Sequence, residues 1–112
     1  MARLKTGIWV GAERRLCEAK ALPLTIVHKG HEEAGMVLIK HYMARDRVTV
    51  FQQTRNMEGK LIWRAGTGEE PVGEFDADEY IQKQRRFDPD LWVIEIDDPK
   101  GGYEPSPYPE RG

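Results

Sequence analysis

The sequence contains a single cysteine, Cys17, so no disulfide can form within the chain. It also lacks any apolar run near the ~20 residues that cross a bilayer, and no long apolar segment of the secretory-signal kind is present. Charges of the two signs almost cancel, at 17 basic and 19 acidic residues, which excludes a global attraction to nucleic acid or anionic lipid. These absences predict a cytoplasmic protein with no membrane partner, and any basic site has to be local.

The composition fits one small domain followed by a tail. A chain of 112 residues with 39% hydrophobic residues can build one core without metal or disulfide support. Residues 99–112 hold four of the seven prolines, together with three glycines. Such a segment buries too little apolar surface to offset the entropy of ordering it. We therefore predict a globular domain over residues 1–98 and a disordered tail over residues 99–112.

The first predicted element is a helix over residues 6–20 with Thr6 as its N-cap. Its apolar face consists of residues at helical spacing, namely Ile8, Trp9, Ala12, Leu16 and Ala19. A short strand over residues 4–10 is the alternative, because apolar residues also alternate there. Cys17 falls off the apolar stripe, and the nearby glutamates would raise its pKa, so we expect a partly buried, unreactive thiol.

Four strands follow, at residues 24–29, 36–42, 47–53 and 60–64. The connections carry turn residues, with Gly30 and Gly35 in the first of them, so the strands are expected to pair as an antiparallel meander. A fifth strand is expected at residues 91–96.

A second helix is predicted between the fourth and fifth strands. Asp76 is its expected N-cap, with Glu79 completing a capping box and Phe75 stapled onto Tyr80; Pro89 stops it. The fold class is therefore α+β, in the order α-β-β-β-β-α-β, with both helices on one face of a largely antiparallel five-stranded sheet. The expected core comprises Trp9, Leu16, Leu38, Val50, Phe51, Tyr80, Ile81, Trp92 and Ile94.

Three stretches of the sequence resemble a known bacterial family. They are Gly7-Ile8-Trp9-Val10 with Arg14-Arg15, the Lys29-Gly30 and Ala34-Gly35 pairs before an apolar strand, and the run from Gln84 to Ile96. The resemblance is to domain of unknown function family 1491, small proteins found mainly in alphaproteobacteria. It covers roughly residues 3–97 and excludes the tail. The family carries no established activity, so it implies a compact bacterial domain and no catalytic residues.

Histidines and a carboxylate offer one candidate for metal binding or hydrolysis, formed by His28, His31 and Glu32. In a hairpin turning at Gly30–Gly35, His41 would lie roughly 15–20 Å from His31, because each strand residue adds about 3.3 Å. That separation argues against a three-histidine site. We therefore expect no metal and no cofactor, and keep a small metal-dependent or hydrolase-like enzyme as an alternative.

Basic and aromatic residues offer the second candidate, a local surface for RNA or single strands. It consists of Trp63, Arg64, Lys83, Arg85 and Arg86. The three basic residues at the helix end also complement the helix dipole, which explains them without a ligand. No nucleophile–base set or cofactor fingerprint is present, so the sequence leaves the function unknown and favours a non-catalytic interaction module with a protein partner. RNA binding is the further alternative.

Overall fold

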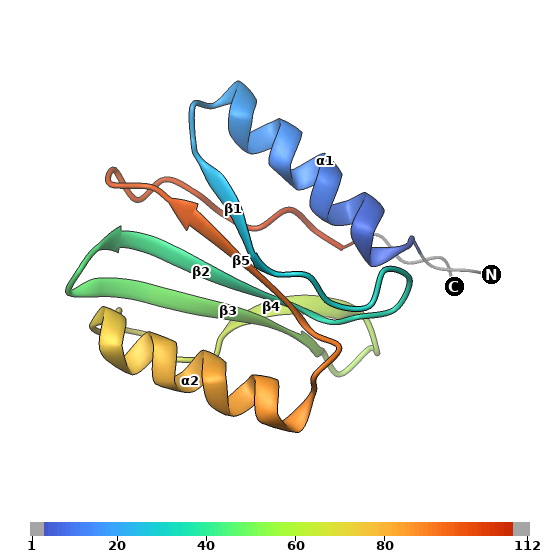
Figure 1. The fold of residues 1–112 in the computed structure, drawn as a ribbon. Coiled ribbons are helices and arrows are strands. Elements are labelled where there is room, and N and C mark those ends of the chain that lie inside the picture. The colour runs from blue at the N-terminus through green and yellow to red at the C-terminus, as the bar shows by residue number, and fades with distance from the viewer. Residues whose placement is uncertain (1–3, 109–112) are drawn as a thin grey trace.

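The computed structural model describes residues 4–108, and its helices and strands follow the predicted order (Figure 1). In chain order they are α1 (Thr6–Ala19), β1 (Leu24–His28), β2 (Val37–Ala44), β3 (Arg47–Arg55), β4 (Leu61–Ala65), α2 (Glu74–Phe87) and β5 (Trp92–Asp97). The α+β class and this order are confirmed. Thr6 begins a helix, so the alternative of a strand over residues 4–10 is wrong.

The sheet has the strand order β1-β5-β2-β3-β4. β2, β3 and β4 form the predicted antiparallel meander, but β5 inserts between β1 and β2, antiparallel to β1 and parallel to β2. The expected hairpin of β1 with β2 is therefore wrong.

The glycines that suggested this hairpin have another use. The loop from β1 to β2 crosses the start of β5, where His31 donates its amide to the Asp90 carbonyl at 2.8 Å. A Cβ on Gly30 would lie 2.2 Å from that carbonyl oxygen, and one on Gly35 would lie 2.5 Å from it. Glycine is needed at both positions because two backbone segments approach closely there.

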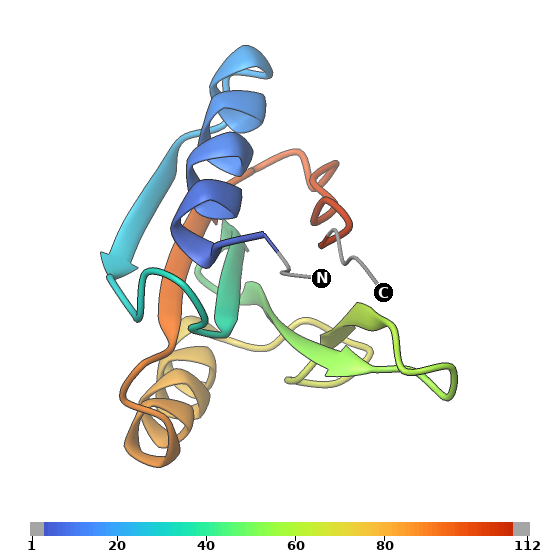
Figure 2. The same cartoon turned by 90° about the vertical axis from the view of Figure 1, so that its right-hand side faces the viewer.

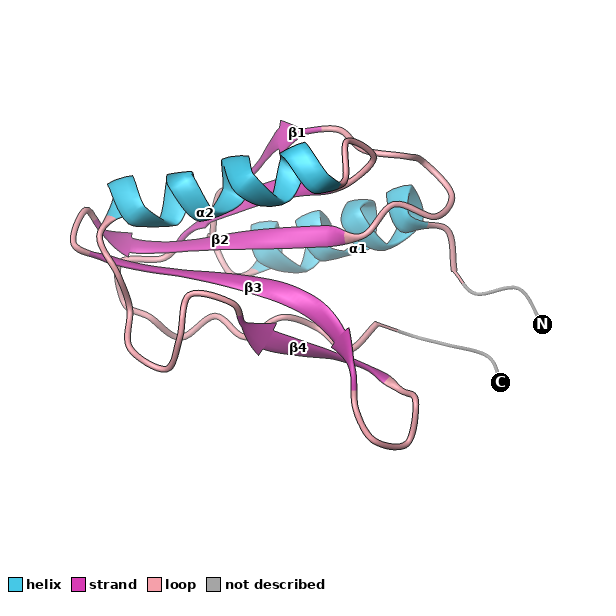
Figure 3. Ribbon diagram, turned by 90° about the horizontal axis from the view of Figure 1, so that it is seen from below, coloured by secondary structure: helices cyan, strands magenta, loops and turns pink. Residues whose placement is uncertain are grey.

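The two helices cover opposite faces of the sheet, so the prediction that they share one face is wrong (Figures 1 and 3). Leu38 and Val93 pack with Ile81 of α2, whereas their neighbours Ile39 and Ile94 pack with α1. Neighbouring residues of a strand point to opposite faces. β2 and β5 are apolar at both sets of positions, which is typical of strands covered on both sides.

α1 buries a side that shares Trp9 with the predicted face but is otherwise different. Trp9, Val10 and Cys17 are in the core, while Ile8 and Leu16 remain 52% and 51% exposed. The buried side also carries two polar residues, Thr6 and Glu13. The Thr6 hydroxyl donates to the Gly35 carbonyl at 2.7 Å, so its burial is compensated.

α2 begins three residues earlier than predicted, because its N-cap is Gly73 and not Asp76. Gly73 is its N-cap without a side-chain hydrogen bond, and the Glu74 amide donates to the Arg45 carbonyl at 2.8 Å. Asp76 lies within the first turn and Phe75 is exposed, so the predicted capping box and staple are wrong. Buried Lys40 instead bonds Glu74 and Asp78, each at 2.8 Å, and ties the first turn to the sheet.

Residues 99–108 return from β5 along α1 and pass over the β3–β4 side of the sheet (Figure 2). We call this segment the strap. Tyr103 and Tyr108 are only 7% and 5% exposed and belong to the core. The prediction of a disordered tail is therefore wrong for residues 99–108, and residues 109–112 lie outside the described residues. Between residues 4 and 108, no helix is both long and apolar enough to cross a membrane.

Candidate functional site

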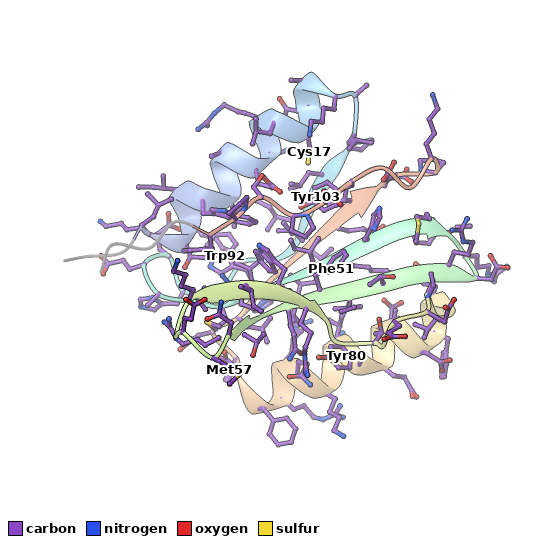
Figure 4. All side chains as sticks on the ribbon, turned by 180° about the vertical axis from the view of Figure 1, so that it is seen from behind. Cys17, Phe51, Met57, Tyr80, Trp92 and Tyr103 are labelled. Carbon is purple, nitrogen blue, oxygen red and sulfur yellow. The ribbon has the colours of Figure 1, made fainter. Side chains whose placement is uncertain are left out.

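The strap rests on side chains from three elements on the α1 face of the sheet. Trp9 and Glu13 come from α1, His41 from β2 and Trp63 from β4; we call these four residues the strap surface. Figure 4 shows Tyr103 of the strap in the layer between α1 and the sheet, close to Phe51 and Cys17. The strap and its surface together hold the largest set of long-range side-chain hydrogen bonds among the described residues, which makes this surface the candidate site.

Glu13 is the centre of these contacts. It is 1% exposed, and its two carboxylate oxygens accept three hydrogen bonds from the strap. Tyr103 Oη donates at 2.7 Å, the Ser106 amide at 3.1 Å and Ser106 Oγ at 2.6 Å. Within residues 4–108 no salt bridge to Glu13 is found. The described donors to this carboxylate are therefore all neutral, two hydroxyls and one backbone amide.

A second contact fixes the other end of the same tyrosine. Asp98 Oδ2 accepts from the Tyr103 amide at 2.8 Å and lies 2.9 Å from His41 Nε2. The His41 ring also packs against the Tyr103 ring, with centroids 5.5 Å apart. Burial alone would raise the pKa of Asp98, but the hydrogen bonds from His41 and from the Tyr103 amide outweigh it and lower this pKa. Tyr103 is thus bound at its backbone, its ring and its hydroxyl.

Aromatic residues hold the far end of the strap. Trp63 Nε1 donates to the Ser106 carbonyl at 2.8 Å. Trp9 contacts Trp63 and stacks on Tyr108, with ring centroids 5.4 Å and 5.5 Å apart. An indole that donates to the carbonyl of a proline-flanked residue, beside stacked rings, is a recurrent way of binding proline-rich segments.

Cys17 lies under the strap but is not an active thiol. It is buried, and desolvation together with nearby Glu13 raises its pKa to about 11. Only the thiolate is a strong nucleophile, so this cysteine stays inert at neutral pH. The expectation of an unreactive thiol agrees with this environment, although Cys17 is buried more deeply than predicted.

The candidate residues for the enzyme alternative each have a separate structural partner. His28 Nδ1 lies 2.9 Å from the Leu91 carbonyl oxygen. His31 Nδ1 accepts from the Glu33 and Ala34 amides at 3.3 and 3.1 Å and so caps its own loop. The Glu32 carboxylate packs against Gly7 in the first turn of α1. Over the described part of the chain, no group of three histidine, cysteine or carboxylate side chains is placed to hold a metal ion.

The five residues of the basic–aromatic candidate do not form one surface. Trp63 packs on the α1 face beneath the strap, whereas Lys83, Arg85 and Arg86 belong to α2 on the opposite face. Burial raises the pKa of Tyr80 in α2, and the nearby positive charge of Arg64 offsets part of this rise, so Arg64 lies near α2 and not with Trp63. The outer side of α2 carries a shallow hollow of about 430 Å³ lined by Lys83 and Arg86 but also by acidic residues, Asp78 and Glu79.

Sequence reasoning assigned none of five residues to a site beneath the tail, namely Glu13, His41, Asp98, Tyr103 and Ser106. From the sequence alone Glu13 is expected to be solvent-exposed on its helix, because charged residues are seldom fully buried. One signal was available: the tail carries two tyrosines, Tyr103 and Tyr108, and large aromatic residues are uncommon in disordered segments.

The fold defines a class of small α+β proteins with solved structures. A protein from Caulobacter crescentus CB15, described as a DUF1491 family protein, shares 33% identity in its crystal structure, with a TM-score of 0.77 over 86% of this chain and 89% of that one. The same description and identity apply to an NMR structure, at a TM-score of 0.78 over 90% and 91%. A protein from A. tumefaciens shares 25% identity, at a TM-score of 0.69 over 85% and 86%.

The family itself follows from the sequence match. The model described as "Protein of unknown function (DUF1491)" matches residues 4–103. The chain belongs to this family, which confirms the resemblance stated above. No curated protein matches the chain. The family match ends at Tyr103, so the whole strap surface lies inside the region that defines the family, while Ser106 and Tyr108 lie outside it.

Proposed function

We propose that this protein is a non-catalytic interaction module of the bacterial cytosol, and that its strap surface binds a proline-flanked segment of protein. The observation that supports the proposal is the strap itself. Residues 103–108, Tyr-Glu-Pro-Ser-Pro-Tyr, occupy the strap surface as a peptide ligand would, with buried tyrosines at both ends and a central serine held by Glu13 and Trp63.

The strap has the properties of a separable ligand. Its contacts are mainly with side chains of α1, β2 and β4, together with Asp98 after β5 and the Leu4 carbonyl before α1, and it adds no strand to the sheet. Lys100, Gly101 and Gly102 form an exposed connection to β5, and Gly101 has a φ of 76°. Prolines on both sides of Ser106 reduce the conformational freedom that binding has to remove. In this chain the surface is therefore occupied in cis, and a partner segment has to compete with a tethered ligand.

The competing functions have less support. An enzyme using His28, His31 and Glu32 would need these side chains to converge, but each is engaged separately in the loop region around β1. RNA binding through Trp63, Arg64, Lys83, Arg85 and Arg86 would need one continuous surface, but the sheet separates Trp63 from the α2 residues.

The test cuts the chain between the domain and the strap and leaves the strap bound by its contacts alone. A protease recognition sequence is inserted at Gly102, and the folded protein is cut there, so that residues 103–112 stay bound only by their contacts. A fluorescent peptide with the sequence of residues 103–108 is then added, and its binding is followed by anisotropy. We expect saturable binding that the unlabelled peptide reverses.

The matched control is the same peptide with alanine in place of both tyrosines, which should not bind. The uncut protein should bind the parent peptide much more weakly, because its tethered strap competes. If the cut, still-folded protein does not bind the parent peptide, or binds the control equally well, the surface is not a peptide site and the proposal is wrong.

A further inference from the structure

Glu13 has a chemical peculiarity that bears on what the strap surface can bind. It is a fully buried carboxylate whose partners are all contributed by the strap, namely the Tyr103 hydroxyl and the amide and hydroxyl of Ser106. A buried carboxylate that loses its donors is strongly destabilised. Whatever occupies the surface must therefore supply hydrogen-bond donors at this point.

We propose that Glu13 is the specificity-determining residue of the strap surface. It accepts a segment with an uncharged donor, serine or threonine, at the position of Ser106, and it rejects a segment with an acidic or phosphorylated residue there. This inference rests on the proposed function, because it concerns the same surface. It names the partner's chemistry: a protein segment with a tyrosine three residues before an unmodified, proline-flanked serine.

Charge and geometry both support the selection. Ser106 Oγ lies 2.6 Å from Glu13 Oε1, so an aspartate or phosphoserine at residue 106 would place a second anion almost in contact with the first. In a buried site such repulsion is weakly screened. The substitution also removes the O–H donor that Glu13 now receives. The second buried carboxylate, Asp98, accepts from the Tyr103 amide of the same strap but is paired with His41, so the charge at the position of residue 106 is set against Glu13.

The tyrosine beside this contact acts as a fixed donor. Burial and the hydrogen bond to Glu13 both raise the pKa of Tyr103, so its phenol keeps its proton at neutral pH. Among the three described donors to the Glu13 carboxylate, the side chain at the position of Ser106 is therefore the one whose charge a partner can vary, since the third donor is a backbone amide.

The first experiment uses the intact chain and compares Ser106→Asp with Ser106→Ala. Strap release is measured by NMR hydrogen exchange of the Tyr103 and Ser106 amides, which donate to Asp98 and Glu13. We expect exchange in the aspartate variant to be at least tenfold faster than in the alanine variant. In a Glu13→Gln background this difference should disappear, because the glutamine amide can donate to the aspartate.

A matched contrast at the neighbouring residue serves as the control. Pro107 is exposed, so Pro107→Asp adds the same charge outside the strap surface, and it should exchange at the same rate as Pro107→Ala. Equal exchange in the two Ser106 variants would overturn the inference. An aspartate effect that persists with Glu13→Gln would also overturn it, because the repulsion would then come from another group.

The second experiment repeats the comparison in trans with the cut protein. Peptides of residues 103–108 carrying serine, alanine or phosphoserine at position 106 are compared by anisotropy. We expect the serine peptide to bind at least tenfold more tightly than the phosphoserine peptide.

The two experiments distinguish the two ideas. If all three peptides bind equally, the surface is a peptide site but Glu13 selects nothing, and this inference is wrong. If none binds while the intact-chain difference holds, the peptide-site proposal is wrong, and the selection by Glu13 acts only on the strap in cis.

Discussion

The hydroxyl of Tyr103 offers the most direct test of the strap's place in the fold. Tyr103→Phe removes one oxygen and keeps the ring that packs against His41. The lost hydrogen bond runs 2.7 Å to the buried Glu13 carboxylate. Hydrogen bonds to charged groups contribute about 1.5–3 kcal/mol, and Glu13 keeps its two Ser106 donors, so we expect a loss near the lower end, about 1.5–2 kcal/mol.

Denaturant unfolding at pH 7 measures this loss, and the denaturant dependence of the unfolding free energy should stay unchanged. Tyr42→Phe is the control, since the Tyr42 hydroxyl makes no hydrogen bond among the described residues, and it should change stability by less than about 0.5 kcal/mol. Tyr103→Ala should cost about 3–5 kcal/mol, because it also empties a buried aromatic site.

The pH dependence provides an independent check on the same contact. The pKa of Tyr103 is raised above its ordinary value of 10.0, mainly by burial and then by Glu13. The hydroxyl therefore stabilises the fold fully below pH 10, and its contribution is lost as the pH rises through the folded-state pKa. The unfolding free energies of Tyr103→Phe and Tyr103→Ala at pH 7 could both lie within about 0.5 kcal/mol of the parent value, which is the usual range for surface substitutions. In that case the strap is not part of the folded structure, and the reasoning on Glu13 is wrong as well.

Three further predictions concern other parts of the molecule. Asp98→Asn should make the unfolding free energy less dependent on pH in acid. The pKa of Asp98 is lowered from its ordinary 3.8, so its stabilising contribution is present above that pH and is lost as the pH falls through the folded-state pKa. Urea unfolding of the parent and the variant between pH 5 and 2 would measure this difference. Gly11→Ala should stabilise the protein by up to about 1 kcal/mol because there is room on α1, whereas Gly30→Ala should destabilise it through a clash with the Asp90 carbonyl, as thermal melting would show. Cys17, with its pKa raised to about 11, should react with iodoacetamide only at the rate of unfolding, and rapid labelling of the folded protein would contradict its burial.

Local patterns predicted the elements well. Each strand was placed within two residues of its observed bounds at either end, because β-branched runs separated by turn residues are local signals. The first helix, predicted over residues 6–20, was placed within one residue of Thr6–Ala19, although Lys5 and not the predicted Thr6 is its N-cap. The buried side of this helix was predicted wrongly, because the apolar residues Ile8 and Leu16 favoured their own side over the side that carries Glu13. The burial of Glu13 depends on donors ninety residues away in the sequence, which no helical periodicity can reveal.

Long-range arrangement was the part that could not be predicted. Short connections suggested that β1 and β2 pair, yet β5 enters between them and brings Asp90 against Gly30 and Gly35. The same insertion makes β2 and β5 central strands, with apolar residues on both faces, and so places the two helices on opposite sides. Of the candidate site residues, only Trp63 belongs to the proposed surface, because the others were grouped by charge in the sequence rather than by the face of the sheet.

The orientation of α1 and the position of the strap are two consequences of one residue. A helix that turned Ile8 and Leu16 inward would carry Glu13 toward solvent, where its carboxylate needs no donors, and the strap would lose three of its hydrogen bonds. With Glu13 inward, the helix leaves Ile8 and Leu16 exposed and requires a donor-bearing segment over its carboxylate. The family match includes Glu13 but ends at Tyr103, before Ser106 supplies two of the three donors. The carboxylate thus lies within the region that the family model matches, while two of its three hydrogen bonds come from Ser106, beyond that region. A surface that needs donors from an added segment is a surface that another segment of the same chemistry can bind.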